Sequence, residues 1–280
     1  MQLVHPPLTV VAATISTLLA GSVLAAAPGS QDAVLADETL TVLGQTYRNT
    51  ATKTRLDPIE TPQAISVVDS ETLEQRGVSS VSEALRYVPG VNTELRGGAV
   101  NRLDLFNIRG FDNYQNFYDG LLLQYNEWNL QPQIDPVAIE QLEVFKGPTS
   151  VLYGSMSPGG MVNLIAKRPQ RESKHSVSVA TGTGTLKEMT LDSTGAINEQ
   201  LAYRVVGLAR QKDGQAVTSE EERYVFAPSL DWQLSDRTLL NLNLYYQKDP
   251  QAGIYTTVPA SGSVKSNPLG QLGRDTFLGA

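Results

Sequence analysis

Residues 224–233 read YVFAPSLDWQ and residues 240–247 read LNLNLYYQ, and in both stretches apolar and polar side chains alternate. Neighbouring side chains of a β-strand point to opposite faces, so each stretch predicts a strand with one apolar and one polar face. A strand of a soluble sandwich alternates too, but these faces run for about ten residues with aromatic side chains at their ends, which is typical of membrane-spanning β-barrels. In the first stretch the apolar face carries Tyr224, Phe226, Leu230 and Trp232.

The same alternation runs through the chain after residue 170. It predicts the first five antiparallel strands of a transmembrane barrel, near 174–181, 186–195, 201–210, 223–234 and 238–247. The connections at 197–200 and 234–237 are tight, whereas 211–222 is long and charged. Barrels of the outer membrane have short periplasmic turns and longer outer loops. We therefore expect 211–222 to be an outer loop, and another outer loop to begin at Lys248.

Residues 53–170 have a different character, because short apolar runs alternate there with helix signals. We expect strands at 64–68, 142–145 and 161–165, a helix at 70–76 that stops at Gly77, and a short helix that starts at Asp135-Pro136. The capping box Ser80-Val81-Ser82-Glu83 predicts a helix through ALRYV that Pro89-Gly90 ends. The predicted fold class is thus a compact α+β domain at 53–170, followed by an incomplete barrel at 171–280.

The N-terminal part predicts export. Residues 8–20 read LTVVAATISTLLA, too short an apolar run to span a membrane but suited to the core of a secretory signal peptide. We assign the signal peptide to residues 1–27, with Ala25-Ala26-Ala27 at the cleavage site; a buried N-terminal helix is the alternative. A polar periplasmic linker follows at 28–52. Within it, Glu38-Thr39-Leu40-Thr41-Val42 is either a short first strand or an extended peptide that a partner binds by strand addition.

Composition excludes several function classes. The chain of 280 residues has no cysteine and two histidines, which removes thiolate zinc sites, disulfides and cysteine nucleophiles and leaves little for a histidine-based site. The net charge of −7 argues against a nucleic-acid partner. Residues 155–160 are rich in Gly and Ser but lack the Gly-Lys-Ser/Thr end of a phosphate loop. The sequence therefore predicts a protein that is not an enzyme.

Short motifs in a fixed order carry a family resemblance from residue 38 to about 170. Most specific is Ile134-Asp135-Pro136, followed by the run 139–148 (IEQLEVFKGP), Leu152-Tyr153-Gly154, Pro158-Gly159-Gly160 and Val162-Asn163. The earlier motifs are 38–42, 52–54, 61–68, 85–91, 108–111 and 119–120. In this order the chain resembles the TonB-dependent outer-membrane siderophore receptors, in which a plug domain lies inside a barrel. Residues 38–42 look like the TonB box of that family.

Within this family the chain is most similar to the ferrichrome-type hydroxamate receptors, on the sequences 203–210, 219–224, Pro228 and 248–253. The resemblance implies that Arg96, Tyr114, Gln115, Trp128 and Tyr255 contact the ferric siderophore. Alternatives are that Arg96 pairs within the plug and that Trp128 belongs to its core. A siderophore arrives with its iron already chelated, so we expect no protein cofactor and no metal ligands, only aromatic walls and hydrogen-bond donors.

The resemblance also implies the partners and the mechanism. The siderophore docks on outward-facing plug loops, the plug shifts, and TonB, with its inner-membrane ExbB/ExbD complex, binds Glu38, Thr39, Leu40, Thr41 and Val42. A monomer in the outer-membrane lipid is expected. The second hypothesis is that this chain by itself transports nothing, because five strands cannot close a barrel that takes about 22 in such transporters. It would then be either a truncated gene product or the N-terminal portion of a longer receptor. A third, a passive porin or polysaccharide-binding β-protein, has no use for a TonB box.

Overall fold

The computed structural model describes residues 63–93, 95, 104–123, 132–214, 216–252, 258–273 and 275–276. The chain divides into two units, residues 1–45 and 46–280, and all features below belong to the second. Among the described residues, no helix is long and apolar enough to cross a membrane. The predicted signal peptide and the predicted TonB box both lie outside the described residues.

The α+β part is built on a five-stranded sheet with the order β1-β7-β8-β5-β6. Its strands are β1 (Ala64–Asp69), β7 (Ile139–Lys146), β8 (Gly160–Ala166), β5 (Asn116–Tyr118) and β6 (Leu121–Leu122). Only the pair β5 and β8 is parallel, and it joins three residues of each strand. A second, three-stranded sheet has the order β2-β3-β4, from β2 (Val91–Asn92), β3 (Phe106–Ile108) and β4 (Phe111–Asn113). We call this part the plug.

The helices of the plug follow their sequence signals with one difference. Helix α1 (Ser70–Arg76) begins where the Asp69 side chain accepts a hydrogen bond from the Thr72 N–H, 2.8 Å, and ends at Gly77, whose φ is 59°. Helix α2 (Val81–Leu85) has the predicted N-cap, Ser80, but it does not continue through residue 88. The N–H of Arg86 and that of Val88 each bond three residues back, because the approach to Pro89 disfavours α-helix.

Two short helical turns complete the plug. The 3-10 turn η1 (Pro136–Ala138) starts where predicted, with the Asp135 carboxylate accepting from the Val137 N–H. Helix α3 (Ser150–Tyr153) was not predicted, since its four residues are too few to show a helical period. The main core of the plug contains Val81, Leu85, Phe106, Ile108, Leu142, Val144, Val162 and Leu164. On the other face of the sheet, Phe117, Phe145 and Met161 form a smaller core.

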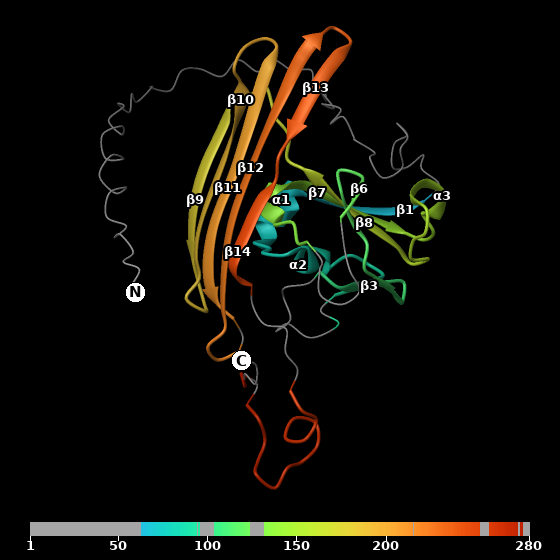
Figure 1. Ribbon diagram of the computed structural model, residues 1–280, viewed down its shortest axis with the longest axis vertical. Helices are drawn as coiled ribbons and strands as arrows, with labels where there is room; N and C mark the ends of the chain where they lie inside the picture. The colour runs from blue at the N-terminus through green and yellow to red at the C-terminus, as the bar shows by residue number, and fades with distance from the viewer. Residues whose placement is uncertain are drawn as a thin grey trace, which may run out of the picture. The chain divides into compact units, whose positions relative to one another are not determined.

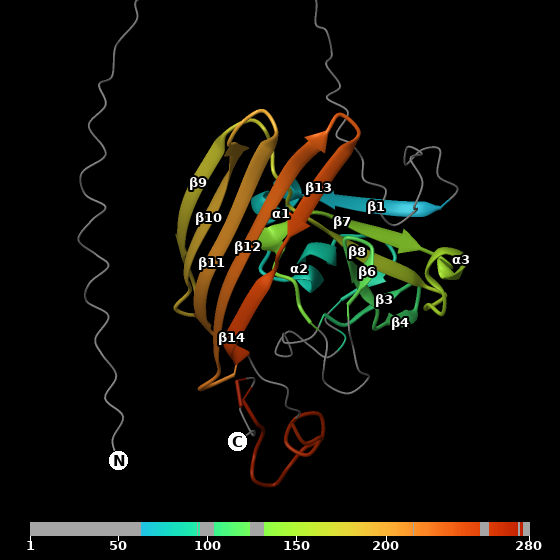
Figure 2. The same ribbon diagram turned by 45° about the horizontal axis from the view of Figure 1, so that its top comes forward.

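The second part of the chain is an antiparallel sheet with the path β13-β12-β11-β10-β9, while β14 also pairs with β12. The strands are β9 (Lys174–Thr181), β10 (Lys187–Ala196), β11 (Leu201–Asp213), β12 (Glu220–Ser235), β13 (Thr238–Asn243) and β14 (Tyr246–Ala252). Figure 1 shows these long strands side by side, and Figure 2 shows α1, α2 and β7 on one side of them. The described strands form an unclosed sheet, which confirms the predicted fold class.

The strand boundaries correct the sequence prediction at the outer end. Strands β11 and β12 run through most of the predicted loop 211–222, so that only 214–219 connects them. The charged side chains there are cross-strand partners, because Lys212 lies opposite Glu221 and their side chains form an ion pair of 3.1 Å. Beyond Lys248, strand β14 continues to Ala252, so the outer loop begins later than predicted. The predicted fifth strand, 238–247, is divided at residues 244–245.

The two faces of the large sheet differ as the alternation predicts. Tyr224, Phe226 and Trp232 are 44%, 49% and 45% exposed on the outer face, as are Leu242 and Tyr246 at 53% and 56%. On the inner face, Val225, Ala227 and Ser229 are buried. The apolar face with aromatic side chains is thus the face turned away from the plug, which suits contact with lipid.

Candidate functional site

The plug contacts the large sheet through η1 and the residues on either side of it. Ala138 and Val137 pack against Val206, Leu208, Val225 and Ala227 of β11 and β12. The side-chain hydroxyl of Tyr245, between β13 and β14, accepts a hydrogen bond of 2.8 Å from the Asp135 N–H. The contact therefore has a small apolar centre, and charged groups lie at both of its ends.

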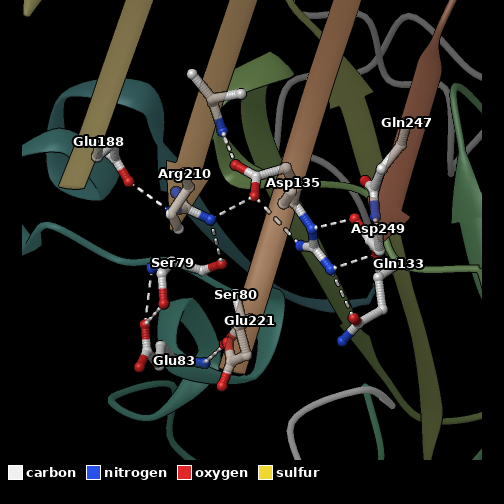
Figure 3. Close-up of polar contacts among 12 residues, drawn as sticks. Ser79, Ser80, Glu83, Gln133, Asp135, Glu188, Arg210, Glu221, Gln247 and Asp249 are labelled. Atoms are coloured by element: carbon white, nitrogen blue, oxygen red, sulfur yellow. Dashed lines mark hydrogen bonds and ion pairs between the residues drawn. The ribbon is translucent and has the colours of Figure 1, made fainter. Parts of the chain in front are cut away.

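At one end lies the Asp135 cluster, formed by Asp135, Arg210, Arg223, Glu188 and Asp249 (Figure 3). Asp135 has no exposed surface, and its Oδ2 accepts from Arg210 Nη1 at 2.7 Å and from Arg223 Nη1 at 3.2 Å. The remaining charges of the cluster lie on the sheet itself. Arg210 also pairs with Glu188 of β10, and Arg223 makes two bonds of 2.9 and 3.0 Å to Asp249 of β14.

At the other end lies the Arg204 cluster, formed by Arg204, Asp192, Glu140, Lys167 and Glu74. Arg204 makes a bidentate contact with Asp192, at 2.9 and 2.8 Å, and reaches Glu140 of the plug at 3.3 Å. Lys167 bonds the same Asp192 at 3.0 Å. The segment 133–140 is therefore held on the sheet by ion pairs at both ends.

The charges in these clusters compensate one another. Removing Asp135 alone would leave two guanidinium groups in a buried place with one carboxylate partner each, an arrangement that costs several kcal/mol in comparable proteins. Beside the cluster is a polar cavity of about 110 Å³ between plug and sheet, lined among others by Ser79, Glu83, Gln133, Lys212 and Gln251. Sequence reasoning missed both clusters, although charged residues such as Arg204 and Arg210 within a membrane strand are themselves a signal.

The plug also contains two buried acids, Asp104 and Glu143, whose environment raises the pKa. Burial raises the pKa of Asp104 to about 6, against the opposing effects of Arg223 and of a hydrogen bond from Ser82. Burial raises the pKa of Glu143 to about 7, although hydrogen bonds from Asn163 and Gln141 lower it. The sequence does contain a signal for Glu143, because an acidic residue stands between apolar residues of β7 that are buried.

Of the predicted siderophore contacts, the structure describes Tyr114 and Gln115. Both lie in the connection between β4 and β5, where Tyr114 is 38% exposed and its hydroxyl donates to Asp112 Oδ2 at 3.3 Å. The Gln115 side chain donates to the Ser155 carbonyl at 3.4 Å, which joins this connection to the one after α3. Arg96, Trp128 and Tyr255 lie outside the described residues, as do the predicted TonB-binding residues.

Comparison with known proteins identifies the class first. Residues 57–161 match the family described as the TonB-dependent Receptor Plug Domain. The chain contains the plug domain of a TonB-dependent receptor, and the relatives that it matches are siderophore receptors and transporters, not enzymes. It is accordingly a protein of the outer membrane.

Individual relatives place it more narrowly. The chain is 40% identical over 232 residues to the ferrichrome outer membrane transporter/phage receptor of Escherichia coli K12, which covers 80% of this chain and 31% of that protein. It is also 40% identical over 224 residues to the ferrioxamine receptor of Yersinia enterocolitica, covering 78% and 31%. The pyoverdine receptor FpvA of Pseudomonas aeruginosa PAO1 superimposes with a TM-score of 0.64 at 26% identity, over 73% of this chain and 31% of that one. The chain spans about a third of these relatives.

Proposed function

We propose that the protein is part of a receptor that imports ferric siderophores of the hydroxamate class across the outer membrane. The observation that carries this proposal is the 40% identity with the ferrichrome transporter and the ferrioxamine receptor, which extends over most of the chain. The ordered motifs of the plug support it, and so does the docking of the plug on the inner face of the sheet.

The siderophore contacts in this proposal are Arg96, Tyr114, Gln115, Trp128 and Tyr255. A guanidinium donates charge-assisted hydrogen bonds to hydroxamate oxygens, while tyrosine and tryptophan give walls with an apolar body and a polar edge. The partial exposure of the Tyr114 side chain supports its role. Iron is cargo here and comes with its own ligands, so the protein has no cofactor of its own in this proposal.

Energy comes from the inner membrane through TonB and its ExbB/ExbD complex. TonB binds Glu38-Thr39-Leu40-Thr41-Val42 as an added strand in the periplasm, a mode in which main-chain hydrogen bonds supply affinity. The domain organisation that goes with it is a signal peptide at 1–27, a linker at 28–52, the plug at 53–170 and barrel strands from 171. The receptor acts as a monomer.

The described sheet ends at β9 on one side and at β13 and β14 on the other. An open sheet edge in lipid leaves backbone groups without partners, so a transporting barrel needs strands beyond these. We therefore propose uptake for the receptor to which this sequence contributes. The alternative is a shortened receptor that binds TonB or siderophore without transport.

Deletion of residues 38–42 tests the mechanism in cells that depend on a single purified ferric siderophore for growth. We expect uptake of labelled ferric hydroxamate to be lost while binding to the cell surface is kept. Uptake that survives the deletion would refute the TonB role. Growth on ferric catecholates but not on ferric hydroxamates would refute the substrate class, and absence of all uptake with the intact gene would favour the shortened receptor.

A further inference from the structure

Glu143 lies at the centre of the plug sheet and has no exposed surface. Its register partners are Val67 on β1 and Asn163 on β8, so its side chain shares a face with Phe145 and Met161 of the smaller core. Its Oε2 accepts from Asn163 Nδ2 at 3.0 Å, and its Oε1 accepts from Gln141 Nε2 at 3.1 Å. Within the described part of the chain, no lysine or arginine forms an ion pair with it.

None of the described titratable groups around Glu143 forms a cationic pair with it. Asp69 lies on the same face of β1, and Tyr153 faces it from α3. Asp119 faces it from the turn between β5 and β6 and is itself paired with Arg168 at 3.7 Å. From β8 it meets only the neutral amide of Asn163. A carboxylate that is buried among neutral partners is costly, whereas a protonated carboxyl is not. The Gln141 amide can turn to accept the added proton, while Asn163 is fixed by its second bond.

That second bond leads to the predicted ligand contacts. Asn163 Oδ1 accepts from the Gly120 N–H at 2.9 Å and so ties the turn of the β5–β6 hairpin to β8. The hairpin is also joined to β8 by the short parallel pair of β5 and by Asp119 in its turn. The Asp119 N–H donates to the Leu164 carbonyl at 2.8 Å, and Asp119 Oδ1 accepts from the Ala166 N–H at 3.1 Å. Tyr114 and Gln115 directly precede this hairpin and Trp128 follows it in the sequence. Glu143, Asn163 and Gly120 therefore form a relay from the plug interior to the segment that bears the predicted siderophore contacts.

We propose that Glu143 is protonated in the closed plug and that its ionisation releases the β5–β6 hairpin, so that siderophore binding by this protein is linked to proton uptake. Low pH holds the hairpin on β8 through Asn163. Ionisation places a charge in a site without a cation, and opening of the hairpin hydrates it. The link to siderophore rests on the proposed function, whereas the release of the hairpin does not.

Hydrogen exchange of the β5–β6 backbone amides tests the release without any ligand. With the protein in outer-membrane vesicles, the opening equilibrium of residues 116–122, corrected for the intrinsic pH dependence of exchange, is compared between pH 5 and pH 8. We expect it to rise on the order of 50-fold in the wild type, from the difference between the usual pKa of glutamate and that of Glu143. In Glu143→Gln, which keeps the shape and the bond to Asn163, the rise should disappear.

Glu71→Gln is the matched control, since Glu71 is exposed on α1 and accepts a hydrogen bond of 3.0 Å from the Gln75 side chain. Glu71→Gln should behave as the wild type. A comparison with Asp104→Asn separates the contribution of Asp104, the other acid whose pKa is raised by burial. An equal rise in Glu143→Gln and in the wild type overturns the proposal. If Glu143→Gln does not fold, a wild-type equilibrium that stays constant from pH 5 to pH 8 overturns it equally.

A second arm measures binding of ferrichrome to the same vesicles at both pH values. We expect weaker binding at pH 8 in the wild type and none of this difference in Glu143→Gln. Absence of any ferrichrome binding in both proteins would contradict the proposed function and leave the exchange result to decide the hairpin release. Equal pH dependence of binding in both proteins would overturn the link to Glu143.

Discussion

Asp135 and Glu143 are eight residues apart in the plug, and both are completely buried, yet their surroundings are opposite. Asp135 faces two arginines of the large sheet, whose other partners are carboxylates of β10 and β14. Glu143 faces two amides within the plug. A buried carboxyl group thus serves two purposes here: with cations it attaches the plug to the sheet, and without them it becomes a site for a proton.

Asp135→Asn should have the largest effect, because it leaves Arg210 and Arg223 with less negative charge than the buried site requires. We expect the plug to become less stable by about 3–5 kcal/mol, the usual cost of removing one partner from a buried ion pair. The free energy of plug opening, from hydrogen exchange at β7 and β8, measures this. Asp112→Asn, at an exposed position, is the control. A loss below about 1 kcal/mol would mean that the cluster does not hold the plug.

The pH dependence of plug stability should be the next largest effect. Because burial raises the pKa of Glu143 from 4.5 to about 7, the folded plug binds a proton more tightly than the unfolded chain. Stability is therefore full below about pH 4.5 and falls as the pH rises through about 7, by about 3 kcal/mol in total. Exchange at β8 between pH 4.5 and 8 measures the slope. A stability that rises over this range would contradict the account.

Asp104 should add a somewhat smaller total loss of stability, of the same sign and at lower pH. Burial raises its pKa from 3.8 to about 6, so stability is lost between these values as the pH increases. Asp104→Asn should remove the contribution of Asp104, which lies between about pH 3.8 and 6, and leave the loss between about pH 4.5 and 7 that belongs to Glu143. If the contributions of Asp104 and Glu143 both vanish in Asp104→Asn, the two acids titrate as one unit.

Glu140→Gln should have the smallest effect, because Arg204 keeps both bonds to Asp192 when Glu140 is neutral. The Glu140 side chain is 35% exposed, and partly exposed ion pairs contribute about 1 kcal/mol or less. The same exchange measurement at β7 should show a loss of that size. A loss of stability as large as that of Asp135→Asn would mean that the greater exposure of Glu140 does not make its ion pair weaker than those of Asp135.

The sequence predicts the repeating elements of this fold well, because their signals are local. The apolar face of β12, the helix that begins at Ser70 and the turn that begins at Asp135-Pro136 follow from period and capping. The sequence does not predict the outer ends of β11 and β12. Charged residues such as Lys212 and Glu221 are typical of a loop, and their pairing across the two strands cannot be seen in the sequence. The predicted helix is longer than α2 because the disfavouring of α-helix by Pro89 begins several residues before it.

The buried clusters could not be derived in the same way. Arg210 lies 75 residues from Asp135 in the sequence, and only the docking of η1 on β11 and β12 brings them together. Two predicted siderophore contacts, Tyr114 and Gln115, lie in one connection, and their role stays a prediction, as do those of Arg96, Trp128 and Tyr255. The ligand contacts come from resemblance, whereas the ion pairs and the protonated acid come from the fold.

The most direct test of the contrast between the two carboxyl groups is infrared difference spectroscopy at pH 6, which reports the protonation of each side chain. The wild type minus Glu143→Gln should show the carbonyl band of a protonated carboxylic acid. The wild type minus Asp135→Asn should show only the paired bands of a carboxylate. A carboxylate signal from Glu143 at this pH would contradict the account, because the buried site would then hold a charge that no cation compensates.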